Sequence, residues 1–172
     1  MQIMYIHNKT AIMTEGAMCI ALSFVLSRIV LFRMPQGGSI SFELVPLLLF
    51  TYRRGFKWGI GAGALVGVIK ILFGGYFLNV LQVLLDYPVA FACVGFAAIS
   101  PKILGLIVAA VLHISCSVIS GVIFFANFAP EGQSPFIYSL AYNVPVLSVK
   151  YIVCGIIAFF LWKYIERLIP EK

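Results

Sequence analysis

The chain has 172 residues, of which 62% are hydrophobic and 10% are charged, and its mean hydropathy is +1.07. A soluble domain of this length cannot bury so much apolar surface in one core, so the composition excludes an ordinary soluble protein. Because one bilayer crossing takes about 20 mainly apolar residues, the chain has room for roughly five to seven transmembrane helices and for no separate soluble domain. We therefore expect one all-α membrane domain over residues 1–172.

Breaks in the apolar pattern divide the chain into six predicted transmembrane helices. Clusters of Gly and Pro separate them, as is typical of loops. The first ten residues are too few and too polar for a cleaved signal, so the first apolar segment is expected to remain as a helix. The predicted helices cover residues 11–32, 41–52, 58–73, 78–99, 103–128 and 136–169.

The basic residues predict the orientation of these helices. They fall in alternate loops, which share one side of the membrane, and the positive-inside rule makes that side cytoplasmic. Both termini are then cytoplasmic, and the loops at 35–38, 74–75 and 130–135 lie outside. This bias accounts for the net charge of +6 without nucleic-acid binding, and it favours contact with anionic lipid of the bilayer. The basic residues concerned are Lys9, Arg53, Arg54, Lys57, Lys102, Lys163, Arg167 and Lys172.

Few residues are suited to catalysis or to metal binding. The four cysteines stand singly inside apolar helices, which indicates small buried side chains and no metal site or disulfide framework. No glycine-rich phosphate loop followed by Lys-Ser or Lys-Thr is present, so the chain is not expected to hydrolyse ATP. With two histidines and six acidic residues, no catalytic set stands out. We expect no enzyme activity, no metal and no cofactor.

Polar residues from the fourth and sixth predicted helices fall at a similar depth below the outer surface. Asp86 and Tyr87 lie one to two turns down the fourth helix. Tyr138 lies near the mouth of the sixth, and Asn143 is about 7.5 Å deeper at 1.5 Å per residue. Each residue alone is equally well explained as an ordinary helix end. Because ionisable groups at membrane depth usually face a cavity, the set predicts an outward-facing pocket.

The fifth predicted helix contributes a stripe to the same level. Ser117, Gly121 and Phe125 are spaced by four, so they share one helix face that rises toward the outer surface. Three charged residues also fall in the outer halves of their helices: Arg28, Glu43 and Lys70.

Five short segments are informative together, although each alone would be weak. They are MPQGGSIS at 34–41, YRRG at 52–55, LDYPVAF at 85–91, ISGVIFF at 119–125 and YSLAYN at 138–143. In this order, from about residue 14 to residue 143, they resemble the thiamine-specific substrate-binding subunits of energy-coupling factor (ECF) transporters.

The resemblance implies six helices and an outer pocket formed by the later helices and the first outer loop. It implies that Asp86 binds the aminopyrimidine of thiamine and that Phe125 stacks on the ligand. Tyr87, Tyr138 and Asn143 match further ligand contacts. The chemistry is consistent, since an aromatic face attracts the thiazolium cation by about 0.5–2 kcal/mol. A carboxylate accepts from the exocyclic amine, and Asn both donates and accepts.

Two departures from the family pattern concern the pocket. Ser117 stands where some members carry a histidine, and His113 lies one turn deeper on the same stripe. Either His113 replaces that histidine from below or it is a satisfied core residue, and the sequence favours the core residue. The first outer loop also lacks the Trp that some members place over the ligand. Both departures affect the identity of the ligand more than the fold.

Ala17 and Ala21, together with Gly16, form a small-residue face on the cytoplasmic half of the first helix. Small residues let helices approach closely in lipid, and spacing alone would favour packing within this chain. The resemblance instead implies docking on the transmembrane coupling subunit of an ECF transporter, which works with two ATPase subunits. Lys150, near mid-membrane in the sixth helix, either snorkels or pairs with Glu15 or with a partner's acid.

The predicted function is vitamin binding without catalysis, in the membrane of a bacterial cell. Thiamine enters the outer pocket, the outer loops close over it, and separate ATPases drive its release inside. One alternative keeps the architecture but changes the ligand to another vitamin or a thiamine precursor. A second is a proton-coupled carrier with Asp86 or Glu43 as the proton site, which the absence of an internal repeat disfavours. A third is a small membrane enzyme, which the missing catalytic set disfavours.

Overall fold

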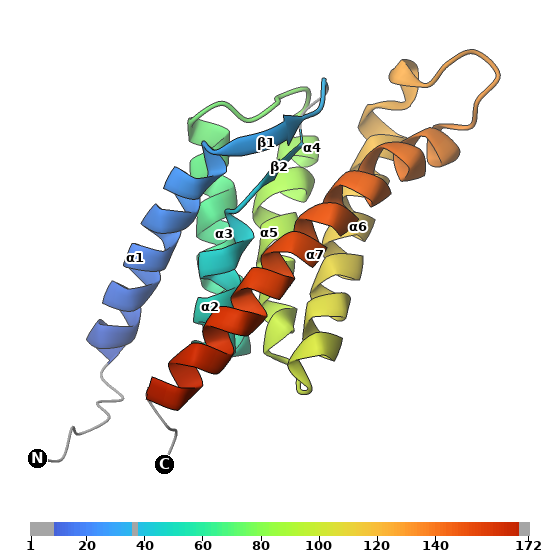
Figure 1. Ribbon diagram of the computed structural model, residues 1–172. Coiled ribbons are helices and arrows are strands. Elements are labelled where there is room, and N and C mark those ends of the chain that lie inside the picture. Colours follow the sequence, from blue (N-terminus) through green and yellow to red (C-terminus); the bar gives the residue numbers. More distant parts are fainter. Residues whose placement is uncertain (1–8, 36–37, 169–172) are drawn as a thin grey trace, which may run out of the picture.

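The computed structural model describes residues 9–35 and 38–168 and has the form of a helical bundle with a small β-hairpin at one end (Figure 1). Its helices are α1 (Lys9–Ser27), α2 (Leu44–Arg54), α3 (Phe56–Leu72), a composite helix (Val80–Ala98), α6 (Lys102–Phe124) and α7 (Pro135–Leu168).

Over the described residues, four helices are long and apolar enough to cross a membrane: α1, the composite helix, α6 and α7. With 11 and 17 residues, α2 and α3 are shorter. Large apolar side chains remain exposed on the outside of the bundle, among them Leu72, Ile107 and Phe160. Such a surface is expected where the neighbour is lipid. The chain is therefore a mostly helical, multi-pass membrane protein, and six crossings remain a prediction.

The all-α prediction is wrong in one place, where the chain forms a β-hairpin. Strand β1 (Val30–Arg33) pairs antiparallel with β2 (Ser39–Ser41), and Val30 lies opposite Ser41. The helices predicted at 11–32 and 41–52 thus each took in residues of a strand. The apolar residues of β1 continue the apolar run of α1, and hydrophobicity alone does not separate a short strand from a helix.

The other four predicted helices agree with the structure to within four residues at each described end, and the predicted end at residue 169 lies outside the described residues. The largest difference is at the end of α6, where the helix stops at Phe124 and a single 3-10 turn (Ala126–Phe128) follows. Such differences at helix ends do not change which residues face the interior.

The composite helix owes its irregularity to Pro88. Proline lacks the N–H that the helical ladder needs, and its ring clashes with the preceding turn. The chain responds by widening into one π-helical turn, Leu85–Val89, between the short helices α4 (Val80–Leu84) and α5 (Ala90–Ala92), and it ends in a 3-10 turn, Cys93–Ala98. The π turn carries Asp86, so the kink positions a candidate site residue.

Glycines on α3 allow a close approach to the composite helix. A Cβ on Gly63 would lie 2.1 Å from the carbonyl oxygen of Phe91, and one on Gly67 would lie 2.5 Å from that of Tyr87. Small residues at a spacing of four bring two helix backbones together in this way. The contact holds the π turn in place from behind.

The short helix α2 forms the centre of the core. Leu44, Leu47 and Leu48 are fully buried, and α1, α3 and α7 pack around it. Directly before α2 lies Glu43, which is also fully buried. A carboxylate at this position requires positive partners.

One end of the bundle holds most of the basic residues, among them Lys9 at the start of α1 and Lys102 at the start of α6. α1 begins and α7 ends at the same end, which also holds the turn between the composite helix and α6 (Figure 1). There Glu15 accepts hydrogen bonds from Arg53 and Arg54, which ties α1 to the end of α2. The β-hairpin and the loop before α7 lie at the opposite end.

Candidate ligand-binding site

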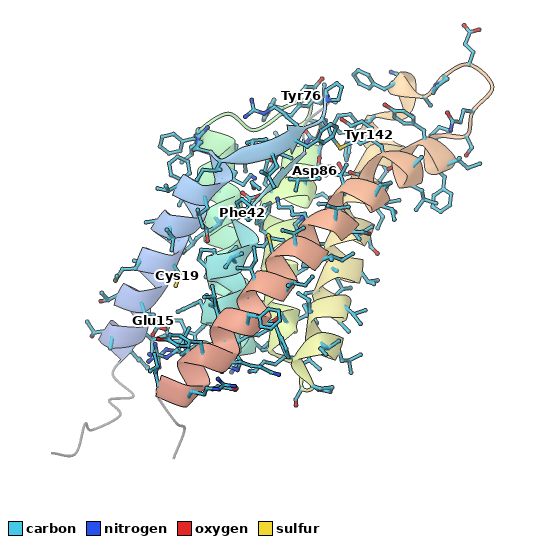
Figure 2. The ribbon with its side chains drawn as sticks, in the orientation of Figure 1. Glu15, Cys19, Phe42, Tyr76, Asp86 and Tyr142 are labelled. Atoms are coloured by element: carbon cyan, nitrogen blue, oxygen red, sulfur yellow. The ribbon has the colours of Figure 1, made fainter. Side chains whose placement is uncertain are left out.

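A cavity of about 510 Å³ lies between the hairpin, the composite helix, α6 and α7. It lies toward the hairpin end of the bundle, where Tyr76, Asp86 and Tyr142 gather (Figure 2). The structure brings all seven predicted ligand-binding residues together around this cavity: Asp86, Tyr87, Ser117, Gly121, Phe125, Tyr138 and Asn143.

Asp86 is held by its neighbour one turn earlier. The Gln82 amide Nε2 donates to Asp86 Oδ2 over 2.6 Å. Gln82 is itself buried, it accepts from the backbone N–H of Leu78 at 3.0 Å, and its amide also lies 3.3 Å from the carbonyl oxygen of Tyr76. Gln82 thus fixes the Asp86 carboxylate at the cavity, and the loop before the composite helix fixes Gln82.

Tyr87 acts on the same loop. Its hydroxyl accepts a hydrogen bond of 2.6 Å from the backbone N–H of Tyr76. The ring of Tyr76 then lies 5.7 Å from the ring of Phe125, at an angle of 33° between the ring planes. Tyr76 and Phe125 form an aromatic wall on the cavity, and Tyr87 positions one half of it.

Gly121 admits α7 against α6. A Cβ on Gly121 would lie 2.1 Å from Ser139 Oγ, and this hydroxyl donates to the carbonyl of Val118 at 2.9 Å. Gly121 therefore shapes the site by having no side chain. The close contact places Ser139, and with it the residue one turn further along α7, at the cavity wall.

Asn143 is that residue. Its Nδ2 donates to the carbonyl oxygen of Ser139 at 3.1 Å and lies 3.4 Å from the carbonyl oxygen of Ser117. These contacts occupy the amide nitrogen, and the amide oxygen has no bonded partner within the described chain. The oxygen is free to accept from a ligand. Nearer the mouth, the rings of Tyr138 and Tyr142 lie 5.9 Å apart.

His113 lies deeper and is buried. Its Nδ1 lies 3.1 Å from the hydroxyl of Tyr151, and its ring is 5.1 Å from that of Phe91. The residue has a partner inside the core, as the favoured interpretation expected. It also lines the cavity, so the residue borders the space that a ligand would fill.

A buried ion triad lies beside the cavity. Lys70 donates to both carboxylate oxygens of Glu43, at 2.8 Å and 2.6 Å, and Lys150 donates to the same carboxylate. Lys70 and Lys150 both line the cavity. Lys150 therefore pairs with Glu43 of this chain, and it neither snorkels nor pairs with Glu15.

The small-residue face of α1 divides in the structure. Gly16 is buried, and a Cβ there would lie 3.0 Å from the ring of Phe50 on α2. Ala17 and Ala21 are exposed. Gly16 was predicted to share one face with Ala17 and Ala21, but it packs inside the bundle. The two alanines lie on the exposed surface of the bundle.

Several cavity residues were missed from the sequence. Gln82 and Ser139 each lie one helical turn before a predicted site residue, Asp86 and Asn143, and that spacing was the signal available. Tyr76 lies in a loop, where no periodicity indicates which side chain turns inward.

Comparison with known proteins identifies the family. The family described as "Thiamine transporter protein (Thia_YuaJ)" matches residues 13–170. The thiamine transporter ThiT of Bacillus subtilis (strain 168) is 38% identical over an alignment of 157 residues, and the match covers 80% of this chain and 82% of that protein. The thiamine transporter ThiT of Lacticaseibacillus paracasei is 26% identical over an alignment of 159 residues, and the match covers 80% of this chain and 79% of that protein.

Two solved structures share the fold. ThiT from Listeria monocytogenes superimposes with a TM-score of 0.83 at 26% identity, covering 93% of this chain and 97% of that chain. The S component of a bacterial ECF transporter gives a TM-score of 0.64 at 21% identity, over 95% and 100% of the two chains. These relatives are transporters and not enzymes. The match over residues 13–170, with an identity of 38% to one member, shows that this chain belongs to the thiamine transporter protein family.

Proposed function

We propose that this protein is the substrate-binding subunit of a thiamine importer in the bacterial cell membrane. Family membership and the S-component fold support a role in substrate binding. The observation that carries the choice of ligand is the pairing of two hydrogen-bond acceptors, Asp86 and Asn143, with the aromatic wall of Tyr76 and Phe125.

The wall and the acceptors suit the two halves of thiamine. Asp86 accepts a hydrogen bond from the exocyclic amine of the aminopyrimidine. The amide oxygen of Asn143 accepts a hydrogen bond from a second donor group of the ligand. Phe125 and Tyr76 stack on the rings and attract the thiazolium cation with a strength of about 0.5–2 kcal/mol. Tyr138 and Ser117 border the ligand, while Tyr87 positions Tyr76.

The orientation follows from charge. The basic end of the bundle faces the cytoplasm, so both termini are cytoplasmic and the cavity opens outward. All six helices cross or enter the membrane as one domain over residues 1–172. The enclosed position of α2, whose Leu44, Leu47 and Leu48 are fully buried, lets this short helix remain inside the bundle without spanning the full bilayer.

Transport requires partners. The chain binds thiamine, and a transmembrane coupling subunit with two ATPase subunits supplies the energy. Ala17 and Ala21 on the outward face of α1 dock on the coupling subunit, because small side chains let a second helix come close.

Titration of the purified chain with thiamine tests the proposal. Calorimetry in a non-ionic detergent is expected to give saturable heat with thiamine and none with riboflavin or biotin. Binding of riboflavin or biotin in place of thiamine would refute the ligand and leave the family intact. A purified chain that binds none of the three would refute the binding role as stated.

Reconstitution separates the proposed subunit from a proton-coupled carrier. In vesicles the lone chain is expected to bind thiamine without accumulating it under an imposed pH gradient. Both carboxylate oxygens of Glu43 are already held by lysines, which leaves Asp86 as the carboxylate available to a carrier mechanism at the cavity. Accumulation driven by the gradient would favour the carrier.

A further inference from the structure

The ion triad beside the cavity, formed by Glu43, Lys70 and Lys150, has two positive groups and one negative group. Two ammonium groups, from Lys70 on α3 and Lys150 on α7, share the single carboxylate of Glu43. Glu43 and Lys150 are buried, whereas the Lys70 side chain keeps 19% of its surface exposed. The triad as a whole therefore carries one excess positive charge, and of the two lysines on the cavity wall Lys70 has the more exposed side chain.

Within the described part of the chain, Lys70 and Lys150 form ion pairs with Glu43 alone. The remaining described acids form no ion pair with either lysine: Glu15 pairs with Arg53 and Arg54, Glu166 accepts from Trp162 Nε1, and Glu131 is exposed in the loop before α7. Asp86 lines the same cavity, but its carboxylate accepts from Gln82 and, among the described residues, pairs with no lysine.

The other groups around Lys70 do not neutralise it. Its Nζ lies 4.9 Å from the centre of the Phe91 ring, a contact that attracts a cation but adds no negative charge. Arg28 lines the same cavity, where its guanidinium donates to the carbonyl oxygen of Phe73 at 2.9 Å, and it brings a second positive charge. A charge held away from bulk water is costly unless it is paired. The cavity, at about 510 Å³ against about 30 Å³ for one water, has room for a counterion beside an organic ligand.

We propose that Lys70 and Arg28 form a site for a small monovalent anion, such as chloride, on the cavity wall. The anion supplies a second negative charge, because the single carboxylate of Glu43 balances only one of the two lysines. The site exists whether or not a vitamin is bound. Where the proposed function also holds, the anion offsets the repulsion between Lys70 and a cationic ligand, so anion and thiamine bind with positive cooperativity.

Chloride NMR line width tests the site directly, without thiamine. The purified protein in non-ionic detergent is titrated with chloride in gluconate buffer at constant ionic strength. The parent is expected to show saturable excess broadening that bromide displaces. Lys70→Met is expected to lose it, because the Glu43 and Lys150 pair that remains is neutral. Lys57→Met is the matched control, since it removes one exposed charge from the same helix, and it should behave as the parent does.

Two results would overturn the site. One is an absence of saturable broadening in the parent, which needs no variant to fold and would mean that Lys70 is neutral or otherwise compensated. The other is broadening that survives in a Lys70→Met protein with a normal melting profile.

A second arm measures the cooperativity. The affinity of the parent for thiamine is expected to be about 5-fold or more higher in chloride than in gluconate, and that of Lys70→Met to be equal in both. Chloride binding with no effect on thiamine affinity would leave the anion site standing and refute the coupling. If thiamine does not bind at all, the proposed function fails, and the line-width measurement still decides the anion site.

Discussion

Gln82 and Asp86 are joined by a hydrogen bond of 2.6 Å across one turn of the composite helix, and Asp86 lies within the π-helical turn that Pro88 causes. Gln82 is buried and Asp86 borders the cavity. The amide therefore fixes one carboxylate oxygen and leaves the other side of the group toward the ligand. A ligand amine donor meets a positioned acceptor there, and this arrangement determines the first prediction.

Asp86→Asn is expected to weaken thiamine binding by about 5- to 150-fold, corresponding to about 1–3 kcal/mol for an unpaired buried polar group. The Gln82 amide would hold the oxygen of the new side chain, so its NH₂ group would face the ligand amine, donor against donor. Calorimetry measures the change. Glu131→Gln, an equivalent change in an exposed loop, is the control and should bind as the parent does. An Asp86→Asn protein with parental affinity and a normal melting profile would show that Asp86 is only a helix residue.

Asn143→Ala is expected to reduce thiamine affinity by less, toward about 5-fold, because water can enter the space and satisfy the ligand donor. The amide nitrogen bonds only within α6 and α7, so the variant also loses a small amount of stability. The same calorimetric titration measures it. Parental affinity in Asn143→Ala would exclude the amide oxygen from ligand binding.

Gly121→Ala is expected to destabilise the protein by about 1–3 kcal/mol and to lower thiamine affinity, since the new methyl group would overlap Ser139 and force α7 away from α6. Gly61→Ala is the matched control: it is an exposed helical glycine with open space around its Cβ position, and the change should be neutral or slightly stabilising. Thermal melting in detergent compares the two. Equal melting temperatures for both variants would mean that α6 and α7 are not in close contact at Gly121.

Glu43→Gln is expected to destabilise the protein by about 3–5 kcal/mol, because it leaves two lysines without their carboxylate. Adding Lys150→Met, which removes the more deeply buried of the two charges, is expected to restore part of the loss. Melting temperatures of the parent, the single variant and the double variant provide the measurement. A Glu43→Gln protein as stable as the parent would show that the triad does not contribute to the fold.

The sequence predicted most of the helices because long apolar runs must be helical in lipid. It did not predict the hairpin, since the apolar residues at 30–32 continue the run of α1. Helix spacing and the family resemblance together predicted seven site residues, and all seven line one cavity. The triad could not be predicted from the sequence, because Lys70 and Lys150 lie 27 and 107 residues from Glu43 and no local pattern joins such partners.

Replacement of Ala17 and Ala21 by Trp is expected to abolish thiamine uptake in cells while leaving thiamine binding by the purified chain unchanged. Both alanines are exposed on α1 and neither lines the cavity, so bulk added there would block a partner helix without altering the ligand site. Ile119→Trp, on the exposed face of α6, adds similar bulk to a different lipid-facing surface and should leave uptake intact. Uptake of labelled thiamine, together with calorimetry on the purified variants, separates the two effects. If the alanine variants still take up thiamine at the parental rate, the docking surface lies elsewhere on the bundle. If they lose binding as well, α1 supports the ligand site and the docking assignment fails.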